Sequence, residues 1–120
     1  MSASVLVADD DPNIVLSLEF LMKRAGYRVR VARDGDEVLA AMEAEIPDLV
    51  LLDLRLPDGN GIDLLAEFHA VRPRTRVIVM TAHGTEMTEA EVTSAGAYAL
   101  VHKPFDLDHV VRLTQRAAAS

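Results

Sequence analysis

Acidic side chains gather where two apolar runs of this sequence end. Asp9, Asp10 and Asp11 directly follow one run. Asp53 follows a second run of four apolar residues. If the two runs are neighbouring parallel strands, their carboxyl ends meet at one edge of a sheet and the carboxylates converge. Like charges held that close destabilise a fold unless a cation neutralises them, and Mg²⁺, for which Mn²⁺ can substitute, prefers such oxygen ligands.

A hydroxyl group and an ammonium group stand at the ends of two further apolar runs. Thr81 ends one run, and Lys103 ends the other immediately before Pro104. Beside an aspartate, these groups can bind and neutralise a phosphoryl group, as electrostatic catalysis of phosphoryl transfer requires. Each feature alone has an ordinary explanation, because solvated acidic loops, strand threonines and solvated lysines are all common. The combination at four predicted strand ends is what favours phosphoryl chemistry.

Short apolar runs alternate with helical periodicity along the chain, which is typical of a parallel sheet with crossover helices. The predicted strands are Val5 to Ala8, Arg28 to Val31, Leu49 to Asp53, Arg76 to Met80 and Tyr98 to Val101. The predicted helices are Asp11-Pro12 to Gly26, Asp36 to Ala44, Ile62 to Val71, Glu86 to Ala95 and Leu107 to about Ala118, with Pro47 and Pro73 closing the second and third. The expected fold is α/β and flavodoxin-like, a doubly wound five-stranded parallel sheet in the order 2-1-3-4-5 with helices on both faces.

Length and charge narrow the functional classes. The chain has 120 residues, so residues 1–120 are expected to form a single domain. Its net charge of -7 opposes direct binding to nucleic acid or to anionic membranes. There is no cysteine and the four histidines are scattered, so zinc is not expected. The first apolar run is too short for a signal peptide or a membrane span, and a cytoplasmic location is predicted.

The motifs at the four strand ends resemble those of the receiver domains of two-component response regulators, over essentially the whole chain. They are Asp9-Asp10, Asp53, Thr81-Ala82 and Lys103-Pro104-Phe105. The stretches Leu-Pro-Asp-Gly-Asn-Gly, from residue 56, and Met-Thr-Ala-His-Gly, from residue 80, also match the family closely. The resemblance implies a signalling domain and not an enzyme, one that catalyses only its own phosphorylation and dephosphorylation.

The same resemblance implies a role for each acidic residue. Asp53 is the phosphoacceptor and receives the phosphoryl group of a phosphohistidine on a sensor histidine kinase or histidine phosphotransfer protein. Asp10 and Asp53 supply side-chain ligands to Mg²⁺, Arg55 supplies its backbone carbonyl, and Asp9 acts through a metal-bound water. The phosphorylated domain then switches conformation and signals to an output domain or target that the sequence does not identify.

The resemblance also implies phosphoryl-binding and switching residues. Thr81, the backbone of Ala82 and Lys103 contact the phosphoryl oxygens, and the peptide bond before Pro104 is cis. Thr81 is also expected to act in the conformational switch.

Three further positions vary within the family or depart from its pattern. Arg55 and His83 occupy variable positions in the family that tune the lifetime of the phosphorylated state. The second switch position, three residues before Lys103, carries Leu100 where receivers usually have Tyr or Phe.

Three other functions remain possible on the residues alone. A Mg²⁺-dependent phosphatase also uses an aspartate nucleophile, but it normally places a second acid two residues later, where Pro12 interrupts here. An interaction module of the same fold needs no phosphorylation. An FMN-binding flavodoxin-like protein needs a phosphate loop with little negative charge, which the three consecutive aspartates oppose.

The first predicted helix carries two apolar surfaces. The stripe predicted to face the core comprises Ile14, Leu18, Leu21 and Ala25. Leu16 and Phe20 fall on the opposite side and need a partner. That partner is either the fifth helix of the same chain or a docking kinase.

Overall fold

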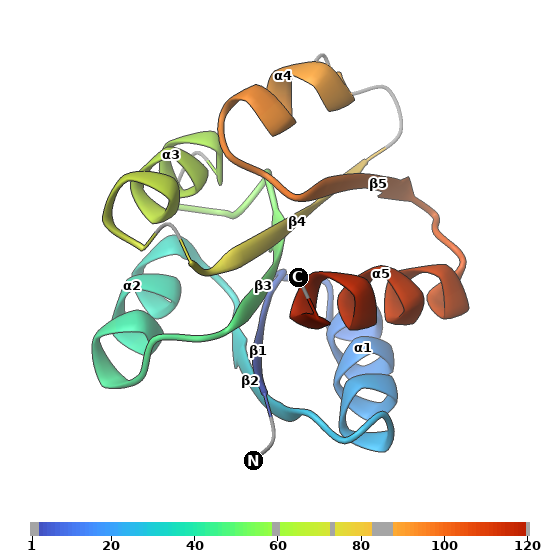
Figure 1. Cartoon of the computed structure of the whole chain (residues 1–120). Coiled ribbons are helices and arrows are strands. Elements are labelled where there is room, and N and C mark those ends of the chain that lie inside the picture. The colour runs from blue at the N-terminus through green and yellow to red at the C-terminus, as the bar shows by residue number, and fades with distance from the viewer. Residues whose placement is uncertain (1–2, 59–60, 73, 83–87, 120) are drawn as a thin grey trace.

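The computed structural model describes residues 3–58, 61–72, 74–82 and 88–119. Its strands are β1 (Ser4–Ala8), β2 (Arg28–Ala32), β3 (Leu49–Asp53), β4 (Arg76–Ala82) and β5 (Ala99–Lys103). Its helices are α1 (Pro12–Arg24), α2 (Gly35–Ala44), α3 (Gly61–Val71), α4 (Glu89–Ser94) and α5 (Leu107–Ala119). The strands form one parallel sheet in the order β2-β1-β3-β4-β5, which confirms the predicted fold class and strand order (Figure 1).

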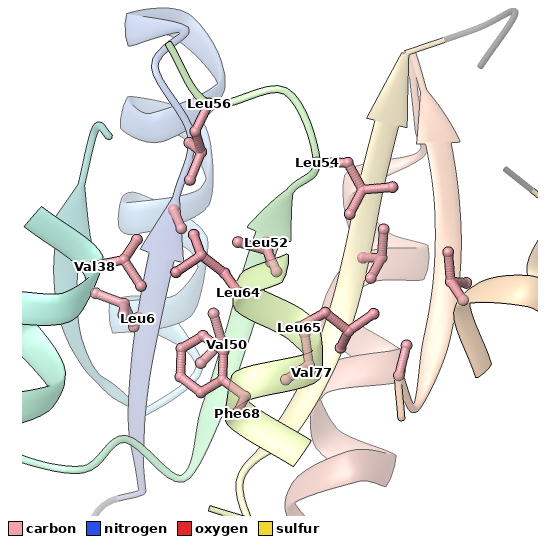
Figure 2. Close-up of a cluster of buried hydrophobic side chains, with 14 of the residues drawn as sticks. Leu6, Val38, Val50, Leu52, Leu54, Leu56, Leu64, Leu65, Phe68 and Val77 are labelled. Atoms are coloured by element: carbon pink, nitrogen blue, oxygen red, sulfur yellow. The ribbon is translucent and has the colours of Figure 1, made fainter. Parts of the chain in front are cut away.

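Helices cover both faces of this sheet and create two apolar cores. Helices α1 and α5 lie side by side on one face, and α2, α3 and α4 lie on the other (Figure 1). Because successive strand side chains point to opposite faces, Leu49 and Leu51 of β3 enter one core while Val50 and Leu52 enter the other. Figure 2 shows the core that contains Val50 and Leu52, where strand residues meet Leu65 and other α3 side chains. The central strands are therefore buried on both sides and end at the rim of the core.

Strand β2 lies at one edge of the sheet and differs from the buried central strands. It carries Arg28 and Arg30 among partly buried residues. The guanidinium of Arg30 donates to the carbonyl oxygens of Ala41 at 2.6 Å and Glu45 at 2.5 Å, at the carboxyl end of α2. Arg28 pairs with the carboxylate of Glu45 at 2.9 Å. Both arginines thus tie the edge strand to its neighbouring helix.

The ends of α1 confirm the sequence prediction. The carboxylate of Asp11 accepts hydrogen bonds from the backbone N–H groups of Asn13 and Ile14, and Pro12 occupies the first helical turn. At the other end Gly26 has φ of 100°, the left-handed backbone that favours glycine.

The predicted core stripe of α1 is wrong by about one residue. Val15, Leu18 and Met22 are the buried side chains of this helix, whereas Ala25 is exposed and Ile14 and Leu21 are only partly buried. Apolar residues surround most of the helix, so periodicity alone does not select the packed face. Contacts with β1, β2 and α5 select it instead.

Leu16 and Phe20 remain at the surface, with 68% and 63% of their area exposed. In the part of the chain that the structure describes, α5 packs beside α1 without covering them. Of the two partners considered for this patch, the fifth helix therefore does not cover it.

The fourth helix begins later than predicted. Thr88 has an extended backbone and caps α4, which starts at Glu89; Glu86, the predicted start, lies outside the described residues. The Thr88 side chain accepts from the Glu91 N–H, and the Glu91 carboxylate accepts from the Thr88 N–H at 3.2 Å, a reciprocal capping box. A threonine followed by glutamate three residues later was the sequence signal that was missed.

Other boundaries differ slightly from the predictions. Strand β4 extends two residues beyond Met80, and β5 runs from Ala99 to Lys103, because Ala82 pairs with Lys103. Helix α2 ends at Ala44, ahead of Pro47. Pro73 lies outside the described residues. Within the described ranges, no helix has the length and apolar character needed to cross a membrane.

Candidate functional site

The carboxyl edge of the sheet gathers the predicted acidic residues. Ala8 of β1 pairs with Leu52 of β3, so Asp9 and Asp53 follow at the same level. One carboxylate oxygen from each of Asp9, Asp10 and Asp53 lies within 4.8 Å of the others. Asp9 and Asp53 are buried and Asp10 is exposed, so the cluster opens to solvent on the side of Asp10.

Lys103 bridges the two buried carboxylates. Its Nζ lies 2.6 Å from Asp9 Oδ2 and 3.1 Å from Asp53 Oδ2. The remaining oxygens accept backbone hydrogen bonds at 2.9 Å, Asp9 Oδ1 from the Asp11 N–H and Asp53 Oδ1 from the Arg55 N–H. Every oxygen of the buried pair therefore has a donor, which fixes the orientation of both carboxylates.

The electrostatics of the cluster favour a further cation. Burial raises the pKa of the Asp9 carboxyl, despite the hydrogen bonds from Lys103 and from the Asp11 amide. Burial alone lowers the pKa of Lys103, but its hydrogen bond to Asp9 and the charge of Asp53 outweigh that effect and raise it. One ammonium balances one of three carboxylates, so an excess of negative charge remains. The donors are all oxygen atoms, which suits a hard divalent ion such as Mg²⁺.

Thr81 lies at the same edge, on the strand that neighbours the strand of Asp53. It is buried, and its hydroxyl donates to the Ala82 carbonyl at 3.5 Å, the long limit of a hydrogen bond. The register of β4 with β5 places Ala82 opposite Lys103. The Thr81 hydroxyl is thus only weakly held.

The other predicted site residues differ in where they lie. The peptide bond between Lys103 and Pro104 is cis, the geometry that the resemblance implies. Arg55 directs its backbone N–H to Asp53 and is itself exposed. Leu100 is buried in the core on the α4 side, and His83 lies outside the described residues.

A groove adjoins the cluster on the face that α1 and α5 cover. Its volume is about 440 Å³, and it extends from Lys103 to the first turns of these two helices. The side chains that line it include Asn13, Ile14, Ser17, Phe105 and Leu107. The exposed Leu16 and Phe20 belong to the same helix, α1, but do not line the groove. The sequence did not predict this groove, because its wall is assembled from α1 and the β5–α5 connection.

One contact of the neighbouring β3–α3 connection was also missed from the sequence. The carboxylate of Asp58 accepts hydrogen bonds from the backbone N–H groups of Gly35 and Asp36, at the start of α2. The aspartate in the loop sequence gave a weak signal, because acids are common in turns. Its partners, 23 and 22 residues away, follow only from the folded structure.

A doubly wound parallel sheet with a buried aspartate pair and a lysine counter-ion at its carboxyl edge defines a small signalling domain of the phosphoacceptor class. The chain belongs to the family of response regulator receiver domains, whose family model matches residues 5–115. It is thus a receiver domain of two-component signal transduction. This assignment does not favour the phosphatase or the unphosphorylated module as alternatives.

Curated relatives support the same family. The chain is 39% identical over 117 residues to the DNA-binding transcriptional regulator NtrC of Rhizobium meliloti, covering 98% of this chain and 24% of that protein. It is 34% identical over 119 residues to the nitrogen assimilation regulatory protein NtrX of Azorhizobium caulinodans, covering 98% of this chain and 26% of that protein. The chain therefore spans about a quarter of the length of these relatives.

Solved structures agree in fold. The receiver domain of NtrX from Brucella abortus superposes with a TM-score of 0.90 at 31% identity, covering 97% of this chain and 98% of that chain. A CheY-like receiver domain protein from Methanospirillum hungatei gives 0.92 at 29% identity, covering 99% and 95%.

Proposed function

We propose that Asp53 accepts a phosphoryl group from a phosphohistidine of a sensor histidine kinase or histidine phosphotransfer protein. The phosphorus–nitrogen bond of the donor breaks, and a bond forms between phosphorus and a carboxylate oxygen of Asp53. The observation that carries this proposal is the Lys103 ammonium, which bridges Asp53 and Asp9 at the mouth of the core. A buried carboxylate beside a cation can approach an anionic donor without an uncompensated charge.

The acidic cluster is proposed to hold Mg²⁺, or Mn²⁺ in its place. The side chains of Asp10 and Asp53 and the carbonyl of Arg55 serve as ligands, and Asp9 acts through a bound water. When bound, the ion neutralises charge on the phosphoryl oxygens. The convergence of three carboxylate oxygens within 4.8 Å supports this assignment.

Three groups of this chain are proposed to receive the phosphoryl oxygens. Lys103 shifts its ammonium from the carboxylates toward one oxygen, and the Ala82 N–H donates to another. The Thr81 hydroxyl moves to a third, which its long contact with the Ala82 carbonyl permits. This movement of Thr81 starts the conformational switch.

The phosphorylated state is proposed to end by hydrolysis within the same domain. Arg55 is exposed beside Asp53, where it borders the path of an attacking water. Arg55 and His83 are proposed to set the lifetime of the aspartyl phosphate. The domain then acts on its own phosphoryl group and on no other substrate.

The direct test labels the chain with a radioactive small phosphodonor, such as acetyl phosphate, in the presence of Mg²⁺. The wild-type chain gains a label that hydroxylamine removes, as an acyl phosphate requires, and chelation of Mg²⁺ prevents labelling. Asp53→Asn loses the label, while Asp63→Asn, at an exposed acid in α3, keeps it. Full labelling of Asp53→Asn would refute the assignment.

The kinase is proposed to dock on the groove and on the exposed patch formed by Leu16 and Phe20. The groove reaches Lys103 and shares helix α1 with this patch, so a helix seated on both would bring its histidine to the acidic cluster. Phe20→Ser should slow phosphotransfer from the kinase but leave labelling by acetyl phosphate unchanged. Val71→Ser, at an exposed apolar residue of α3, is the control and should change neither rate. Loss of stability in Phe20→Ser without slower phosphotransfer would contradict the docking site.

Output is proposed to lie outside this domain, in an output domain or a separate target. The relative from Rhizobium meliloti is named a DNA-binding regulator. A net charge of -7 opposes contact of this domain with DNA or with an anionic membrane, so any DNA binding belongs elsewhere. The single-domain extent of residues 1–120 and the cytoplasmic location stay predictions.

A further inference from the structure

The connection between β3 and α3 is tied to the start of α2 by one side chain. The Gly35 N–H donates to Asp58 Oδ1 at 2.6 Å, and the Asp36 N–H donates to Asp58 Oδ2 at 3.2 Å. These amides belong to the first turn of α2, where backbone N–H groups have no partner within the helix. A separate residue, Asp34, caps the same helix locally by accepting from the Glu37 N–H at 2.8 Å.

The tie at Asp58 is tight and charged. A side chain at Gly35 would begin 3.2 Å from Asp58 Oδ1, closer than most contacts of this kind. The hydrogen bond from the Gly35 amide, followed by that from Asp36, lowers the pKa of the Asp58 carboxyl. The carboxylate is therefore ionised at neutral pH and placed against the positive end of α2, where an anion is stabilised.

The same connection carries Arg55, whose carbonyl is a proposed ligand of the cation. Leu54 and Leu56 on either side of it are buried in the core (Figure 2). The Leu54 carbonyl accepts from the Gly61 N–H at 3.0 Å, which closes the connection on itself. Asp58 is thus a polar contact that joins this segment to the start of a second helix, in addition to the apolar packing of Leu54 and Leu56.

We propose that Asp58 is a positioning residue, which holds the β3–α3 connection against α2 and thereby fixes the Arg55 carbonyl for cation binding. This inference rests on the proposed metal site and adds a coupling between that site and the start of α2. Because such a coupling is reciprocal, Mg²⁺ binding must also strengthen the hydrogen bonds of Gly35 and Asp36. The strength of the hydrogen bonds at the start of α2 then depends on Mg²⁺ binding, although α2 supplies no ligand to the proposed metal site.

The test measures the Mg²⁺ affinity of the unphosphorylated chain by titration of amide chemical shifts. Asp58→Ala should weaken affinity about tenfold, as loss of a group that orients a metal ligand typically does. Asp58→Asn should restore part of the loss, since its amide oxygen accepts one of the two hydrogen bonds. Mg²⁺ should slow hydrogen exchange of the Gly35 and Asp36 amides in the wild-type chain and not in Asp58→Ala.

Asp34→Ala is the matched control, because it removes the local cap of α2 and leaves the connection untouched. It should keep the wild-type Mg²⁺ affinity. Equal losses in Asp34→Ala and Asp58→Ala, or no loss in Asp58→Ala, would overturn the positioning role while leaving the proposed function intact. A wild-type chain that binds no Mg²⁺ at Asp53 would overturn the proposed metal site and this inference with it.

Discussion

Lys103 serves in this receiver as an internal counter-ion that a metal ion and a phosphoryl group are both expected to displace. Its ammonium occupies one oxygen of each buried carboxylate. The same group that stabilises the resting fold therefore competes with the cation for these oxygens. Removal of the Lys103 ammonium should therefore lower the stability of the fold and raise its affinity for the metal ion.

We expect Lys103→Ala to lower the free energy of unfolding without Mg²⁺ by about 3 kcal/mol, because it leaves buried carboxylates unpaired. The same variant should bind Mg²⁺ more tightly and yet accept less label from acetyl phosphate, since the phosphoryl oxygens lose a donor. Urea denaturation, Mg²⁺ titration and labelling measure the three effects.

Lys23→Ala is the control for this prediction. Lys23 pairs with Glu19 at 3.1 Å on the exposed face of α1. An exposed ion pair of this kind contributes less than about 1 kcal/mol. If both lysine variants lose the same stability, Lys103 is not a buried counter-ion.

The gathering of the site's side chains at one edge was largely predictable, because each lies at the carboxyl end of a strand. Asp9, Asp53 and Lys103 end apolar runs, and parallel topology alone brings such ends to one edge. Asp58 was not predictable, since its hydrogen bonds go to the backbone of a distant helix and backbone amides carry no sequence signal. The direction of the Thr81 hydroxyl depends on local packing and was equally out of reach.

At the scale of elements, the strand order and the ends of α1 followed from the pattern, while the start of α4 and the packed face of α1 did not. The strands are short and rich in β-branched residues, and long crossover segments connect them. These features leave few possible strand orders. The packed face of α1 was set by its neighbours, because Val15 and Met22 are no more apolar than the residues predicted in their place. The start of α4 depended on the side chain of Thr88, which competes with the helical pattern around Glu86.

The turn between α4 and β5 provides a prediction at this scale. Gly96 has φ of 113°, and an ideal Cβ there would lie 2.5 Å from the His69 ring. We expect Gly96→Ala to lower the free energy of unfolding by about 2 kcal/mol or more, from backbone strain combined with the clash. Thermal or urea denaturation measures this loss.

Gly26 supplies the matched comparison. Its φ is 100°, but nothing lies within 4 Å of an ideal Cβ. Gly26→Ala should therefore show only the cost of the left-handed backbone, about 1 kcal/mol. Equal losses at both glycines would mean that His69 moves aside without cost.

Strand β5 should change little on activation. Leu100 is already buried in the same core as Val92 and Ala97, and its burial is worth only about 1.5–3 kcal/mol. It has no hydroxyl to satisfy in either state, so it does not bias the switch. Amide chemical shifts with and without beryllofluoride should move little at residues 98–101 and more at Thr81 and beyond it.

The loop expected to carry that signal runs from Thr81 to Met87, of which residues 83–87 lie outside the described structure. Large shifts centred on Tyr98 to Val101, with small shifts in this loop, would contradict the prediction. Efficient labelling of the same sample is needed to show that the site itself is competent.

At the scale of the molecule, the sheet separates the proposed docking surface from the α4 surface. One mode of receiver pairing matches a basic fourth helix with acidic residues of the fifth, yet here the segment from Gly84 to Gly96 contains Glu86, Glu89 and Glu91 and no Lys or Arg. Two such faces repel each other. We expect the phosphorylated chain not to dimerise through α4, and a salt-sensitive dimer on that face in sedimentation would show otherwise.

The arginines on β2 have a consequence for the behaviour of the protein at high concentration. An open sheet exposes unpaired backbone groups along its edge strands, which can recruit strands from other molecules. Arg28 and Arg30 bond to α2 and place charge along this edge. A foreign strand added at this edge would have to lie beside these charged side chains, which disfavours aggregation of the folded domain through β2.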